Sequence, residues 1–432
     1  MTLRNIPKDW KWKRLDGLVS RFDAGVSVNG GDRAANAHEF GVLKVSAVTE
    51  GTFLPEENKV IDGAELVRAR LNPKSNRVVM SRANTPSLVG ASAYIHGEHP
   101  NLFLSDKLWQ LEPRHEANFS MRWLGFVLGS PAFRKRLGEI ATGSSQSMKN
   151  ISKESVMQLM LPVPPAEEQG RIAGVLDTWE TAIRKIEQLI AAKKRLHEAL
   201  SGKLLFGLKR LRRCGASEPK SLHWFLMSGE WPVVAIGQVA REVSAGRGEA
   251  ADLPVLSCTK YDGLVDSLQY FKKQVFSHDT SKYKLVQQGQ FAYATNHIEE
   301  GSIGYQDLVS AGLVSPIYTV FQADASRVDD GYLYKLLKTE KLRQLFAAST
   351  NASVDRRGSL RWKEFARIRI PLPPLAEQRR INEILNTSRE EIELLRAEAS
   401  ALKAQKRGLM QKLLTGKWRL PMPENAKETS HA

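Results

Sequence analysis

Residues that perform catalysis in other proteins occur in this sequence without the spacing that catalysis needs. The Pro-Pro pairs at Pro164 and Pro373 lack the preceding Asp or Asn and the following aromatic residue of a DNA-methyltransferase motif. Gly416-Lys417 is followed by Trp418, not by the Ser or Thr of a phosphate loop. The nine histidines show neither HxH nor HExxH spacing. We therefore expect no catalytic centre and no metal site.

The chain carries an excess of positive charge. Its 63 Lys and Arg residues against 47 Asp and Glu give a formal net charge of +16 over 432 residues. Such an excess favours a polyanionic partner, nucleic acid first, although a basic protein without an anionic ligand is the alternative. Only Cys214 and Cys258 are present, and no apolar run reaches the roughly 18 residues of a membrane span. We expect a cytoplasmic protein.

Two sets of loops contain the residue types that contact nucleic acid. Lys and Arg bind phosphates or guanine edges, whereas Asn and Gln pair with adenine. The candidates in the first half are Arg33, Asn36, Lys44, Ser46, Arg82, Asn84, Gln146, Lys149 and Asn150. Those in the second half are Arg247, Lys260, Tyr261, Asn296, His297, Arg356, Arg357 and Arg361. Arg356-Arg357 is the strongest pair, and each single residue is open to the alternative of a solvated surface side chain.

The elements that must position these loops form a tandem duplication. Residues 161–211, which begin LPVPPAEEQGRI, align without gaps with residues 370–420, which begin IPLPPLAEQRRI, at an offset of 209. A weaker copy precedes each of them, since residues 10–25 resemble residues 231–246. The segments between these copies have little in common. The copies at the ends of each half are therefore repeated, whereas the segments between them differ in sequence.

Each strong repeat predicts a long helix. The Pro-Pro pair suits a first helical turn, and the acidic Glu167, Glu168 and Glu377 complement the helix dipole. One apolar seam runs in the same register along both copies, interrupted by Lys193 and His197 in the first copy and by Lys406, which matches His197, in the second. The seam consists of Ile172, Leu176, Trp179, Ile183, Ile186, Ile190, Leu200, Leu204, Ile381, Leu385, Ile392, Leu395, Leu402, Leu409 and Leu413.

The length of these helices decides what they pack against. About forty residues at 1.5 Å per residue span on the order of 60 Å, too far for one small domain to cover. We therefore expect the two helices to pack on each other, antiparallel if the halves are related by a pseudo-two-fold axis. The alternative is that each helix packs only on its own domain.

The segments between the repeats predict domains of mixed structure. Short β-rich runs such as FGVLKVSAV and QFAYAT are separated by Gly, Asn and Asp turns, and helical patterns follow over residues 121–140 and 331–349. The expected fold class is α+β, with two domains of mixed β-sheet and helices separated by two long antiparallel helices that form a coiled-coil spacer.

The chain closely resembles type I restriction-modification specificity subunits at its helix starts. The resemblance is carried by Glu168-Gln169-Gly170-Arg171-Ile172 and Glu377-Gln378-Arg379-Arg380-Ile381, and Gly170 in place of an arginine leaves the pattern intact. It implies target recognition domain 1 at residues 1–160, a spacer helix at 161–211, target recognition domain 2 at 212–369, a second spacer helix at 370–420 and a tail at 421–432.

The resemblance also implies a function. Such a non-catalytic subunit would recognise a bipartite DNA target, one half-site per recognition domain, with the helices setting the gap. The expected partners are double-stranded DNA, two DNA methyltransferase (modification) subunits and motor-nuclease (restriction) subunits, and S-adenosylmethionine, ATP and Mg are expected on those partners. Two alternatives stay open: a coiled-coil scaffold for protein interactions, and a DNA-cleaving enzyme with an unrecognised active site.

Overall fold

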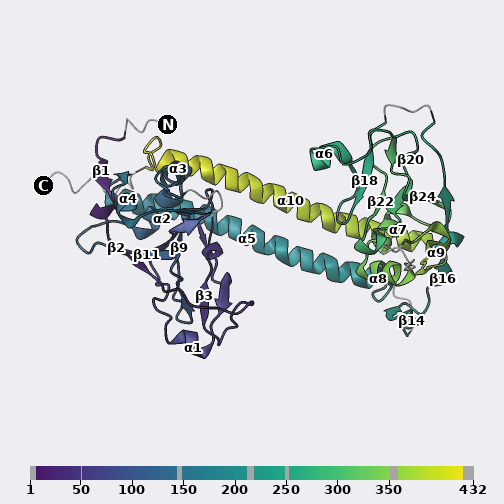
Figure 1. Ribbon diagram of the computed structural model, residues 1–432, viewed down its shortest axis with the longest axis horizontal. Helices are drawn as coiled ribbons and strands as arrows, with labels where there is room; N and C mark the ends of the chain where they lie inside the picture. Colours follow the sequence, from purple (N-terminus) through teal and green to yellow (C-terminus); the bar gives the residue numbers. More distant parts are fainter. Residues whose placement is uncertain are drawn as a thin grey trace. The chain divides into compact units, whose positions relative to one another are not determined.

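The computed structural model describes residues 6–49, 51–143, 148–211, 218–248, 253–350 and 359–421. The chain divides into two compact units (Figure 1). The first comprises Met1–Glu187 with Ala397–Ala432, and the second comprises Gln188–Arg396. Each unit contains one domain and part of both long helices, so the unit boundaries lie within the helices. The boundaries of the five segments expected from the sequence stay predictions.

The first unit is built on a four-stranded antiparallel sheet in the order β2-β11-β7-β9. The helix α2 packs on β7 and β9. Ser120 caps α2 and Ser130 caps α3, where Pro131 occupies the first turn as its fixed φ favours. The elements are β1 Lys11–Arg14, β2 Val19–Ala24, β3 Gly41–Leu43, β4 Val48–Thr49, β5 Thr52–Phe53, β6 Asn58–Val60, α1 Gly63–Leu66, β7 Arg77–Ser81, β8 Ala83–Asn84, β9 Ser92–Ile95, β10 Leu102–Phe103, β11 Leu108–Pro113, α2 Met121–Gly129, α3 Pro131–Glu139, β12 Lys149–Asn150, α4 Lys153–Met157 and β13 Met160–Val163.

The second unit repeats this plan. Its antiparallel sheet has the order β17-β24-β21-β22, and Asp329 and Thr339 cap the helices that follow. In both units a two-stranded ribbon, β1-β13 or β16-β25, leads into a long helix. The elements are β14 Lys220–Leu222, β15 Phe225–Met227, β16 Val233–Ala235, β17 Ala240–Val243, β18 Leu256–Thr259, β19 Gly263–Asp266, α6 Ser267–Phe271, β20 Lys284–Gln287, β21 Phe291–Ala294, β22 Ile303–Tyr305, β23 Ala311–Val314, β24 Tyr318–Ala323, α7 Asp330–Leu337, α8 Glu340–Ser349, α9 Trp362–Phe365 and β25 Arg369–Pro371.

The long helices are α5, Ala166–Leu204, and α10, Leu375–Leu413, each of 39 residues. Every residue of the predicted seam is buried or half-buried. In the first unit Glu180 and Glu187 of α5 pair with Lys406 and Lys403 of α10. The residue number of the α10 partner falls as that of the α5 residue rises, so the two helices run antiparallel. The same antiparallel order holds in the second unit, where Lys193 pairs with Glu391 and the imidazole of His197 lies 3.1 Å from the Ser388 hydroxyl.

The predicted α+β class with two long antiparallel helices is confirmed. Each domain shares its hydrophobic core with the helix ends. In the first unit Trp10 and Trp123 lie in one cluster with Leu176 of α5 and Leu413 of α10, all at most 4% exposed. Full burial of such a side chain is worth roughly 1.5–3 kcal/mol, so the helix ends are part of the fold of each domain. Within the described ranges, no helix offers the length and apolar character that crossing a bilayer requires.

Candidate nucleic-acid interface

A buried glutamine joins each domain to its long helix in the same way. In the first unit the Gln169 side chain accepts a hydrogen bond from the Ser120 N–H, at the start of α2, and donates to the Pro164 carbonyl at 2.8 Å. In the second unit Gln378 accepts from the Asp329 N–H, at the start of α7, and donates to the Pro373 carbonyl. Both side chains are almost fully buried. The first turn of α2 or α7 is therefore held against the start of a long helix in each unit.

The glutamate before each glutamine holds an ion pair that the sequence did not reveal. Glu168, only 2% exposed, accepts from the Trp10 indole and from the Arg419 guanidinium, which also binds Asp9. The bonds to Arg419 lower the pKa of the Asp9 carboxyl. At the equivalent position of the second unit Glu377 accepts from Arg210 at 2.9 and 3.1 Å. The repeated Glu-Gln dipeptide was the one signal that pointed to these anchors.

Four candidates of the first domain come together at one edge. The strand β12 pairs with β8 so that Lys149 lies opposite Asn84, and the Ile151 N–H donates to the Arg82 carbonyl. The Arg82 guanidinium lies 4.0 Å from Asp106, and its Nε has no hydrogen-bond partner in the described part of the chain. Asn150 is exposed beside them. The Lys149 ammonium donates to the Gly143 carbonyl and the Asn84 side chain bonds Ser81 and Thr85, so the unused donor at this edge belongs to Arg82.

Four other first-domain candidates contact acids of their own domain, three through their side chains and Asn36 through its backbone N–H. Arg33 makes two bonds of 2.6 Å to Glu39, which also accepts from the Asn36 N–H, and these bonds lower the pKa of Glu39 to about 2. Lys44 and Ser46 both contact the Glu57 carboxylate, at 2.8 and 2.6 Å. A phosphate would have to compete with these carboxylates. These four residues therefore have a structural contact that residue type alone did not predict.

In the second domain the corresponding edge is formed by two segments. The Leu360 N–H donates to the Thr295 carbonyl, which brings Arg361 beside the loop of Asn296 and His297. Arg361 is exposed, and the Asn296 side-chain oxygen is buried without a partner among the described residues.

The same loop carries acidic groups. His297, Glu299 and Glu300 hold possible ligand atoms within 4.8 Å of one another, but two of the three side chains are exposed and such clusters are common without a cation. The absence of a metal site stays a prediction.

The remaining second-domain candidates lie on other loops. The Arg247 guanidinium donates to the Thr280 hydroxyl at 2.6 Å. Lys260 and Tyr261 form the exposed turn between β18 and β19. Gln146, Arg356 and Arg357 lie outside the described residues.

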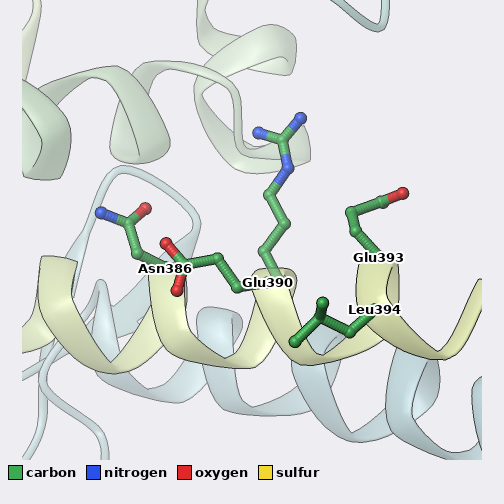
Figure 2. Close-up of a pocket in the computed structure, with 5 residues that line it drawn as sticks. Asn386, Glu390, Glu393 and Leu394 are labelled. Carbon is green, nitrogen blue, oxygen red and sulfur yellow. The ribbon is translucent and has the colours of Figure 1, made fainter. Parts of the chain in front are cut away.

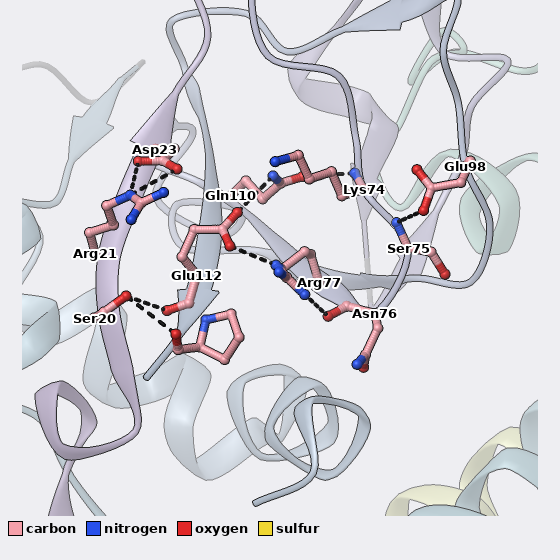
Figure 3. A network of polar contacts seen from close by, with 11 residues as sticks. Ser20, Arg21, Asp23, Lys74, Ser75, Asn76, Arg77, Glu98, Gln110 and Glu112 are labelled. Carbon is pink, nitrogen blue, oxygen red and sulfur yellow. Dashed lines mark hydrogen bonds and ion pairs between the residues drawn. The ribbon is translucent and has the colours of Figure 1, made fainter. Parts of the chain in front are cut away.

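Other charged side chains of the first domain form a polar network that stabilises the fold (Figure 3). The Arg77 guanidinium donates to the Glu112 carboxylate at 2.8 Å, and the Gln110 amide donates to the same group at 3.1 Å. Gln110 also accepts from the Lys74 N–H. Gln110 and Glu112 are buried, so the network fixes the loop before β7 and leaves Arg77 no free charge for a ligand.

A cleft of about 610 Å³ lies along α10 of the second unit, lined by Asn386, Arg389, Glu390, Glu393 and Leu394. Figure 2 shows the labelled side chains projecting from this one helix. Leu394 is 71% exposed. The lining residues hold no set of groups with the arrangement of a catalytic centre.

The family described as Type I restriction modification DNA specificity domain matches residues 7–193 and 251–404. The chain belongs to this family. The predictions of a type I specificity subunit and of a non-catalytic component are therefore confirmed.

Relatives support the assignment along the whole chain. The specificity subunit of the Escherichia coli type I restriction enzyme EcoEI is 26% identical over 195 residues, which cover 45% of this chain and 32% of that protein. The chain thus spans about a third of that relative. A Methanocaldococcus jannaschii protein assigned as the MjaX specificity subunit is 21% identical, covering 96% of this chain and 95% of that protein.

Solved structures show the same fold. The type I S subunit from M. genitalium has a TM-score of 0.55 at 14% identity, covering 97% of this specificity subunit and 98% of that chain. A chain from a structural study of complex assembly and conformational transition of the type I R-M system has a TM-score of 0.54 at 17% identity, covering 96% and 100%.

Proposed function

We propose that this specificity subunit recognises a bipartite DNA target, one half-site per domain, and that α5 and α10 set the gap between the half-sites. One observation carries the proposal: both domains are joined to the long helices by the same glutamine contact, yet the loops that follow β7 and β21 differ in sequence. Two domains that are joined to the helices in the same way but have different loops are suited to contact different bases from equivalent positions.

The charges at the two loop edges support DNA as the ligand. Arg82, Lys149 and Asn150 in the first domain, and Arg361 in the second, offer donors for phosphates and base edges. The formal charge of +16 supplies long-range attraction to a polyanion.

We further propose that the chain serves as the scaffold for two modification subunits and, in a restricting complex, for motor-nuclease subunits. Leu189 and Leu196 of α5 and Leu394 of α10 are 43%, 59% and 71% exposed, an unusual set on polar helices and a suitable surface for partner helices. The partners would carry S-adenosylmethionine, ATP and Mg, and this chain no cofactor. Such a complex would act in the cytoplasm, where its DNA lies.

The test is co-expression with a candidate modification subunit in a host that lacks this activity, followed by single-molecule sequencing to map methylated adenines. We expect methylation at one split motif with a fixed gap. Arg361→Ala should reduce methylation at the same motif, whereas Arg380→Ala, which removes an exposed guanidinium paired with Glu383 on α10, serves as a control for loss of positive charge. A stable complex that methylates nothing, or a motif without a gap, would contradict the proposal.

A further inference from the structure

Exposed apolar side chains concentrate on residues 261–275 of the second domain, which run from the β18–β19 turn through α6 and four residues beyond it. Figure 1 labels α6 and β18. Tyr261 is 77% exposed, Leu268 53%, Tyr270 48%, Val275 47% and Phe271 38%. These are five of the nineteen large apolar side chains that are exposed in the described part of the chain, although the segment has only fifteen residues. Such a cluster favours a surface that a partner covers.

The helix α6 is anchored at its first turn. The Asp266 side chain accepts from the Gln269 N–H at 2.9 Å and caps the helix. Ser267 is fully buried, its hydroxyl lies 2.7 Å from that of Ser257, and its N–H donates to the Val255 carbonyl. The residues after this anchor are exposed. The bonds of Asp266 and Ser267 therefore fix the start of α6, and the apolar side chains that follow it are exposed to solvent.

Tyr270 contacts the ring beside it on α6 and a residue of the β18–β19 turn. The Tyr270 hydroxyl donates to Asp262 at 2.9 Å, and Asp262 is adjacent to Tyr261 in the turn. The rings of Tyr270 and Phe271 are 5.0 Å apart and nearly perpendicular. The side chains of Tyr270 and Phe271 are already restrained by these contacts. Binding a ligand against them would therefore cost little further side-chain entropy.

Three lysines lie among the rings. The Lys260 ammonium lies 5.3 Å from the centre of the Tyr261 ring, and Lys272 and Lys273 follow Phe271. Within the described ranges none of the three lies within 4.0 Å of a carboxylate, and Asp262 and Asp266 bind Tyr270 and the start of α6. The charge of Lys260, after the bonds from Arg343 and Gln344, helps to lower the pKa of the Glu340 carboxyl. We call Lys260, Tyr261, Tyr270, Phe271, Lys272 and Lys273 the α6 surface. Rings beside free cations suit a ligand that has both flat apolar faces and negative charges, which is the chemistry of nucleic acid.

We propose that the α6 surface binds DNA by stacking an aromatic ring on a base at a locally unstacked step of the second half-site, while its lysines contact phosphates. The proposal rests on the proposed function and specifies how that half-site is bound. The first domain has no such surface around its own short helix: α1 is followed by Val67, 82% exposed, and residues 61–70 contain no aromatic residue. Stacking would thus be a property of one half-site.

The experiment measures the affinity of the complete chain with its modification subunit for a duplex that carries the mapped split sequence, at several KCl concentrations. Tyr261→Ala and Phe271→Ala each remove one ring, and Tyr261→Phe keeps the ring. Lys272→Gly removes a cation at a position whose φ of 53° suits glycine, so it tests charge without disturbing the helix end. Trp224→Ala removes an exposed ring from the β14–β15 hairpin of the same unit and serves as the control.

We expect the loss of a stacked ring to raise Kd by about 5- to 150-fold without changing the salt slope. Tyr261→Phe and Trp224→Ala should bind like the wild type. Lys272→Gly should reduce the slope of log K against log salt by about 0.9. Thermal melting of each variant should match the wild type, because the side chains are exposed.

Wild-type affinity in both ring-removal variants would overturn the proposal, as would a loss of modification-subunit binding instead of DNA affinity, which would make the α6 surface a protein interface. The two proposals fail separately. If the wild type methylates a split sequence and the ring-removal variants bind it equally well, only the α6 proposal fails. If the wild type neither binds nor methylates a split sequence, the proposed function fails and the α6 proposal with it.

Discussion

Replacing Gln378 with leucine tests whether the glutamine of the repeated dipeptide holds the second domain to α10. The side chain is 0% exposed. Its oxygen accepts from the Asp329 N–H at 2.9 Å, and its nitrogen donates to the carbonyls of Pro373 at 2.8 Å and Arg327 at 3.0 Å. Leucine keeps most of the volume and removes all three bonds.

The expected magnitude follows from those bonds. A hydrogen bond in a protein contributes about 1 kcal/mol net, and a buried group left without a partner costs about 1–3 kcal/mol. Water can reach the exposed Arg327, so we expect a loss of about 3 kcal/mol in the free energy of unfolding of the second unit. For a unit of this size, about 2–4 °C per kcal/mol places the fall in Tm near 6–12 °C. Gln169→Leu, which removes two bonds, should lower the stability of the first unit by about 2 kcal/mol.

The assay combines calorimetry with hydrogen exchange read by mass spectrometry, since the two units need not unfold together. In Gln378→Leu the amides at the start of α7 should exchange faster, while peptides of the first domain are unchanged. Gln344→Leu, an exposed glutamine of α8, should shift Tm by less than about 2 °C. A Gln378→Leu protein that melts like this control would refute the anchoring role.

Three further predictions concern the helices and the loops. A four-residue insertion between Lys193 and His197, matched by one between Ser388 and Glu391, should lengthen the gap in the methylated motif without altering either half-site, and altered half-sites would contradict modular reading. Burial, with Arg389 and Lys335, lowers the pKa of His197 below its ordinary value of 6.5, so the unfolded chain takes up a proton first as the pH falls. The Tm of the second unit should therefore fall between pH 7 and 5.5, and it should fall less in His197→Gln; equal falls would contradict this role. Lys149→Ala should reduce the salt slope of DNA binding by about 0.9 if Lys149 contacts a phosphate, and an unchanged slope would remove it from the interface.

The helical seam was predictable because it depends on spacing within one segment. Ile172, Ile183 and Leu385 repeat at helical intervals, and each is buried. The anchors were not predictable from spacing, since Gln169 and Gln378 bind backbone N–H groups 49 residues earlier in the chain. Only the repetition of the dipeptide marked these positions.

Residue type was a weaker guide to the interface. Residue type alone predicts that Arg33 and Lys44 contact DNA, yet each binds a carboxylate brought near by the fold, Glu39 or Glu57. The pairing of β8 with β12, by contrast, places Arg82, Asn84 and Lys149 at one edge, and nothing in their separate segments required this. The rings of Tyr270 and Phe271 were not among the sequence candidates, and their exposure depends on how α6 is anchored in the fold.

The discontinuity of the first unit has a consequence for how the protein is made. The second unit is one unbroken stretch of chain, whereas the first needs residues after Ala397 to complete it. Leu176 shares its core with Leu413, and Glu168 with Arg419. At about 5–20 residues per second, a ribosome takes roughly 10–40 s to pass from residue 187 to residue 397. During that interval the first recognition domain has emerged but lacks its C-terminal partner, so the half of the protein that is synthesised first is the half that finishes folding last.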